Sequence, residues 1–166
     1  MKKIFLLLFV VSACEQVYLP KQKAFFAHQF SVPNYINHTF FNNSLENPCS
    51  YSFQINKLSQ IKLDKNCNSI IRYDLLKSKV FLTSILIDNN FEIINADFNN
   101  RITENSLKSR VIKTSEFNDI NKKVYAKYFT FIGDTPSNIH FYITDSVSNY
   151  ISGSLYFDSK PNYDSL

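Results

Sequence analysis

The chain has 166 residues, a formal net charge of +4, three cysteines and only two glycines. No basic block interleaved with aromatic residues occurs, which argues against nucleic-acid binding. Gly133 and Gly153 cannot supply a P-loop, a G-x-G-x-x-G turn or a G-x-S-x-G nucleophile elbow, because each motif needs several glycines at fixed offsets. The length favours one domain with a single core.

The first fourteen residues have the order of a bacterial lipoprotein signal peptide. Lys2 and Lys3 precede an apolar run over residues 4–11, and the small residues Ser12 and Ala13 lead into Cys14 as a lipobox. The run is shorter than the roughly 20 residues that a membrane-spanning helix needs. We expect residues 1–13 to be removed and Cys14 to receive diacylglyceryl and an N-terminal acyl chain such as palmitate. Two or three such chains hold a protein stably at a membrane. The alternative is a plain secretory signal followed by a chance cysteine.

The rest of the chain divides into a short acylated tether over residues 14–23 and one domain over residues 24–166. Residues 24–30 are predicted to form a short strand, and residues 31–48 are predicted to be mostly turn and loop because of their prolines and asparagines. Residues 51–55 alternate apolar and polar side chains, which indicates a half-buried strand.

Two further strands, over residues 68–75 and 79–87, are predicted with a polar turn at Lys77 and Ser78 between them. The period then changes to the three- and four-residue spacing of a helix, carried by Phe91, Ile94, Phe98 and Ile102. This helix is predicted over residues 88–113, with Asp88 or Asn89 capping its start. Its second half, with Leu107, Val111 and Ile112, continues the apolar face less cleanly.

The last forty-odd residues predict an antiparallel meander. Strands are expected over residues 122–132, 138–144 and 150–158, joined by turns at residues 133–136 and 145–149. The fold class is therefore α+β: a twisted antiparallel sheet with a C-terminal three-strand meander and one main helix packed on one face.

Two cysteines remain if Cys14 carries lipid. Cys49 and Cys67 either form a disulfide, which the cell envelope permits, or are separate thiols with one or both buried. A bond would close a loop of roughly 18 residues and stabilise the fold by about 3 kcal/mol.

The histidines give little sign of chemistry. His28, His38 and His140 lack metal-ligand spacing, so no metal site is predicted. A catalytic triad of His140, Asp145 and Ser146 would need a nucleophile turn that the sequence does not show. The favoured interpretation is a turn in which Asp145 bonds the local backbone.

Three motifs follow one another at the C-terminal end: F-Y-I-T-D-S at residues 141–146, Y-I-S-G-S-L-Y-F at 150–157 and P-N-Y-D-S-L at 161–166. They resemble the F-[YF]-x-T-D-S, aromatic-x-x-G-x-L-Y-F and P-N-x-D-S-L segments of the GldD family of gliding-motility lipoproteins from the Bacteroidetes. The similarity extends upstream through residues 18–21, 49–53, 66–71, 123–125 and 133–137.

The resemblance implies a periplasm-facing lipoprotein without enzymatic activity or cofactor, anchored by its lipid to the inner or outer membrane. It would support gliding motility and the associated type IX secretion machinery by contacting other envelope proteins of that machinery. The alternative is an envelope lipoprotein that binds a small ligand or peptide between sheet and helix. The motif residues implied in partner contact or fold are Thr144, Asp145, Ser146, Gly153, Asn162 and Asp164.

The family's paired cysteines favour a Cys49–Cys67 disulfide. The chain departs from the family pattern in having Ser50 for a proline and Asn68 for a tryptophan. Family members continue beyond the last motif into an amphipathic helix, so we expect a chain ending at Leu166 to lack that cover over one sheet face.

Overall fold

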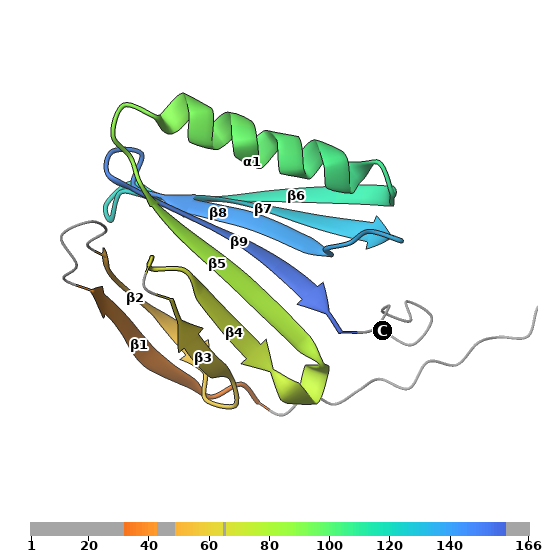
Figure 1. Ribbon diagram of the computed structural model, residues 1–166, viewed down its shortest axis with the longest axis horizontal. Coiled ribbons are helices and arrows are strands. Elements are labelled where there is room, and N and C mark those ends of the chain that lie inside the picture. The colour runs from red at the N-terminus through yellow and green to blue at the C-terminus, as the bar shows by residue number, and fades with distance from the viewer. Residues whose placement is uncertain (1–31, 43–48, 65, 159–166) are drawn as a thin grey trace, which may run out of the picture.

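The computed structural model describes residues 32–42, 49–64 and 66–158, and confirms the α+β class (Figure 1). A two-stranded sheet pairs β1 (Tyr35–Asn42) with β2 (Cys49–Asn56). A seven-stranded antiparallel sheet has the order β3-β4-β5-β9-β8-β7-β6. Its strands are β3 (Gln60–Leu63), β4 (Ser69–Tyr73), β5 (Ser78–Leu86), β6 (Ser109–Asp119), β7 (Val124–Gly133), β8 (Ile139–Thr144) and β9 (Asn149–Phe157). A 3-10 turn, η1 (Asp74–Leu76), joins β4 to β5.

The single α-helix of the described residues, α1 (Phe91–Ser106), carries the chain from β5 to the far edge of the large sheet. The chain then returns through β6, β7 and β8, and β9 enters between β8 and β5. Figure 1 shows α1 over the β6–β9 half of the sheet and the β1–β2 hairpin next to β3 and β4 on the opposite side. The predicted C-terminal meander is confirmed as β7-β8-β9.

The helix packs through the residues whose spacing predicted it. Ile94 and Phe98 are buried with Tyr150 of β9, and Phe91 and Ile102 lie against the same cluster. The Phe98 ring lies 5.1 Å from that of Tyr142 on β8. Phe129 of β7 also packs against this cluster. The helix therefore covers one face of all three strands of the meander.

A second core lies on the opposite face. Ile55 of β2, Ile71 of β4 and Leu82 of β5 are buried together, so the hairpin packs against the β3–β5 half of the large sheet. Phe141 of β8 reaches this cluster across Gly153, which lies between Phe141 and Leu82 in the strand register.

Three local predictions were wrong. Residues 35–42 form strand β1 instead of loop, because all eight pair with β2 and Phe40, 1 % exposed, stacks on the rings of Tyr51 and Phe53. The helix ends at Ser106, and residues 109–113 belong to edge strand β6, where pairing with β7 overrides the helical spacing. Asn90 is the N-cap, without a side-chain cap bond, and its Oδ1 instead accepts a hydrogen bond from the Asp88 N–H at 2.8 Å.

The short strand β3 was not predicted. The expected signal peptide, the tether and the strand over residues 24–30 lie outside the described residues.

Candidate functional site

The family-like motif residues Thr144, Asp145 and Ser146 form the turn between β8 and β9. Thr144 Oγ1 donates to the Asn149 carbonyl at 2.7 Å and accepts from the Ser146 N–H at 2.9 Å. Ser146 has a φ of 64°, in the left-handed region. Both hydroxyl contacts of Thr144 therefore hold the turn.

Asp145 is the centre of this turn. Its Oδ1 accepts from the backbone N–H groups of Val147, Ser148 and Asn149 at 2.8–2.9 Å, and its Oδ2 accepts from Asn149 Nδ2 at 2.7 Å. Partial burial raises the pKa of Asp145, but these hydrogen bonds outweigh it and hold the pKa well below its usual range. The carboxylate is thus engaged by its own turn, as the sequence interpretation expected.

Gly153 is required by a close approach of side chains. A Cβ built at this position would overlap the Phe141 ring and come within 2.9 Å of Leu82 Cδ2. This motif glycine therefore allows Phe141 to reach the Ile55–Ile71–Leu82 core.

The other predicted site residues are only partly described. Cys14, Asn162 and Asp164 lie outside the described residues, as does the side chain of Cys49. Cys67 is 3 % exposed and disulfide-bonded, and its carbonyl accepts a hydrogen bond from the Tyr51 hydroxyl at 3.0 Å.

The structure does not bring His140, Asp145 and Ser146 together as a triad. His140 Nδ1 lies 2.9 Å from Ser154 Oγ, on the neighbouring strand. At about 3.3 Å per residue, Asp145 lies roughly 16 Å further along from His140. Burial, followed by the nearby Arg101 guanidinium, lowers the pKa of His140 to about 4, so its ring is neutral at physiological pH.

His140 is instead part of a cleft between α1 and the sheet. The cleft has a volume of about 690 Å³, within the roughly 300–1,000 Å³ typical of small-molecule sites. Its sheet side presents Thr83, His140, Ser152 and Ser154 from three strands. Its helix side presents Arg101, Glu104, Asn105 and Lys108 from the end of α1 and the residues that follow.

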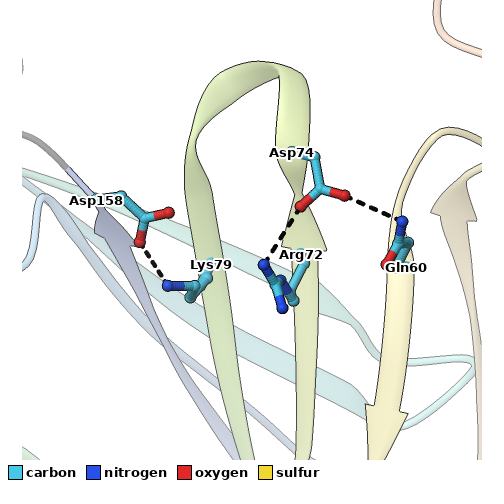
Figure 2. A network of polar contacts seen from close by, with 5 residues as sticks. All are labelled: Gln60, Arg72, Asp74, Lys79 and Asp158. Atoms are coloured by element: carbon cyan, nitrogen blue, oxygen red, sulfur yellow. Dashed lines mark hydrogen bonds and ion pairs between the residues drawn. The ribbon is translucent and has the colours of Figure 1, made fainter.

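One rim of the cleft adjoins a row of polar contacts on β3–β5 (Figure 2). Lys79 Nζ, which lines the cleft, pairs with Asp158 Oδ1 at 2.6 Å. Beside Lys79 in the register, Arg72 pairs with Asp74 at 3.6 Å. Gln60 Nε2 donates to the other oxygen of Asp74 at 3.0 Å. Lys79 therefore reaches the cleft with its charge already balanced by Asp158.

Asn105 fixes the helix end that borders the cleft. Its Nδ2 donates to the Ser137 carbonyl at 2.7 Å, and its Oδ1 accepts from the Ser137 N–H at 3.2 Å. Both residues are buried. Sequence reasoning missed Asn105, Arg101 and Lys108, although their four- and seven-residue spacing on the predicted helix was a usable signal.

Neither a metal centre nor a membrane-spanning helix is found in the described part of the chain. No group of three or more His, Cys, Asp or Glu side chains there could hold a metal ion. None of the helices that the structure describes is both long and apolar enough to cross a membrane.

The described residues thus define an α+β domain whose family-like motifs lie in a hairpin turn and a sheet core, with a cleft between the C-terminal part of α1 and the sheet. The family model described as gliding motility lipoprotein GldD matches residues 15–166, so the chain belongs to that family. No curated protein and no solved structure matches the chain.

Proposed function

We propose that the protein is a lipid-anchored, periplasm-facing component that supports gliding motility and the associated type IX secretion machinery through protein contacts. The observation that carries the proposal is the family match over residues 15–166, which begins one residue after Cys14. The lipobox-like order of residues 1–14 supports Cys14 as the site of lipid attachment.

A role without catalysis is supported by how the motif residues are used. The side chains of Thr144 and Asp145 form their hydrogen bonds within the β8–β9 turn, and Gly153 leaves space for the Phe141 ring. We therefore infer that these residues stabilise the fold, and that other parts of the surface contact the partners.

Contact with other envelope proteins is supported by exposed apolar side chains on the sheet face opposite α1. Phe117 of β6 and Ile143 of β8 lie in one row across the strands, with Ala126 between them, and Tyr128 lies in the next row. All three large side chains are exposed. Aromatic residues are enriched at protein interfaces relative to the rest of the surface.

Complementation tests the proposal. The full-length gene is placed in a gliding bacterium that lacks its own GldD, and colony spreading and secretion of a type IX cargo are scored. We expect rescue by the natural sequence and loss of rescue with Cys14→Ala, because the anchor is gone. Ser12→Ala, which keeps a small residue in the lipobox, is the matched control and is expected to rescue.

Two results would contradict the proposal. The first is no rescue although the protein accumulates at the membrane. The second is full rescue by Cys14→Ala, which would remove the lipid anchor from the mechanism.

A further inference from the structure

We propose that the cleft between α1 and strands β5, β8 and β9 binds the carboxylate or phosphate group of a small molecule, with Arg101 and Lys108 supplying the positive charge. The proposal concerns ligand binding, which the contact role above does not require. It rests on the cleft's volume, the charges on its helix side and the hydroxyl groups on its sheet side.

The two cations on the helix side are free to meet an anion. Within the part of the chain that the structure describes, neither Arg101 nor Lys108 has a carboxylate within the 4.0 Å of an ion pair. Lys79 differs, because Asp158 neutralises it at 2.6 Å. With Glu104 as the other acid of the lining, the cleft holds three cations against two carboxylates.

Arg101 acts on the interior of the cleft. After burial, its charge is the second cause that lowers the pKa of His140, a buried residue of β8 that lines the cleft. The Arg101 guanidinium is therefore within electrostatic reach of the sheet side of the cleft, where it can form a charge-assisted hydrogen bond with an oxyanion.

The sheet side of the cleft offers hydroxyl groups to a ligand. Thr83, Ser152 and Ser154 place three hydroxyl groups on adjacent strands, and Ser152 is 7 % exposed. The hydroxyl groups of Thr83 and Ser152 can donate to the oxygens of an oxyanion, whereas that of Ser154 shares a hydrogen bond with His140 Nδ1. The exposed ring pair of Phe81 and Tyr156, with centroids 5.5 Å apart, borders the cleft and offers an apolar surface to the rest of the ligand.

Isothermal titration calorimetry of the full chain in detergent micelles tests the site. The probes are sodium phosphate and sodium citrate at low ionic strength, with sodium chloride as the reference, since salt screens exposed charges. We expect saturable binding of at least one probe. Saturation by phosphate alone assigns a phosphoryl ligand, and saturation by citrate alone assigns a carboxylate ligand.

Variants that change one charge distinguish binding in the cleft from attraction of the anion by the overall charge of the protein. Arg101→Gln is expected to raise the Kd about tenfold, the loss of one charge-assisted hydrogen bond. Glu104→Gln, on the same helix, is expected to lower the Kd several-fold because it removes a negative charge from the lining. Lys113→Gln is the control: it removes one positive charge from β6, on the opposite sheet face, and should leave the Kd within about twofold.

Two results would overturn the proposal: no saturable heat for either probe, or equal weakening by Lys113→Gln and Arg101→Gln. Circular dichroism checks that each variant is folded, and Lys108→Gln replaces Arg101→Gln if the latter unfolds. The calorimetry does not depend on motility. A failure of the ligand-binding proposal can therefore be distinguished from a failure of the proposed function.

Discussion

At the scale of single residues, Gly153 links the two faces of the fold. Gly153→Ala would place a methyl group against the Phe141 ring and Leu82. We expect a loss of about 1–3 kcal/mol in the free energy of unfolding, the usual cost of overpacking a core. Urea titration measures it.

A second variant tests that mechanism. In a Phe141→Leu background the ring is gone, so Gly153→Ala should cost less than it does in the natural sequence. Equal costs in both backgrounds would show that the Phe141 ring is not what requires a glycine at this position.

His140 gives the fold a pH dependence. Burial lowers its pKa to about 4 from the ordinary value of 6.5, so between these pH values the unfolded chain binds a proton that the folded chain does not. The His140 contribution to stability is therefore complete above about pH 6.5 and is lost as the pH falls towards 4. The loss is on the order of 3 kcal/mol.

The measurement is the free energy of unfolding at several pH values from 7 to 4. His140→Gln should lack most of the decline over this window while keeping a polar contact to Ser154. An identical decline in the variant would assign the pH dependence to other groups.

At the scale of elements, Asn105 ties the end of α1 to the segment before β8. Asn105→Ala removes both hydrogen bonds to the Ser137 backbone and leaves buried polar groups unpaired. We expect a loss of about 2–3 kcal/mol in unfolding free energy. Asn99→Ala, an exposed change on the same helix, is the control and should alter stability by less than about 0.5 kcal/mol. A cost for Asn105→Ala no larger than the control would contradict this role.

Elements with a strong local pattern were predictable from the sequence. Phe91, Ile94, Phe98 and Ile102 marked the buried face of α1, and the alternation in residues 138–144 marked β8. β1 and β6 were missed because pairing over long distances decides them. The asparagines of β1 suggest loop until β2 supplies a partner for every residue, and Val111 and Ile112 fit a helix until β7 lies beside them.

The cleft could not be predicted as a site. Its side chains come from β5, α1, β8 and β9 and from the connections beside them, and the sequence gives no sign that Arg101 and Ser152 lie on the same cleft. The Asp145 turn was predictable, because every group that its carboxylate bonds lies within four residues.

At the scale of the whole molecule, Cys67 joins the small and large sheets. It follows β3, its carbonyl accepts from Tyr51 of β2, and it is disulfide-bonded. We propose Cys49 as its partner, because Cys49 lies two residues before Tyr51 in the same strand.

Peptide mapping by mass spectrometry without reduction should find residues 49 and 67 in one linked pair. Cys49→Ser should lower the unfolding free energy by about 3 kcal/mol, because the unfolded chain gains the freedom of a loop of roughly 18 residues. A different pairing, or an unchanged unfolding free energy, would contradict the proposal.

The position of β9 has a consequence for how the protein is made. It is the last strand of the described chain, yet it lies between β5 and β8 and is the only strand joining the two halves of the large sheet. Ribosomes and export channels both deliver a chain from its N-terminus. Until residues 149–157 emerge, the β3–β5 and β6–β8 segments can form only separate ribbons with open edges. Completion of the large sheet therefore waits for residues 149–157, which keeps the β3–β5 and β6–β8 segments loosely structured until those residues are delivered.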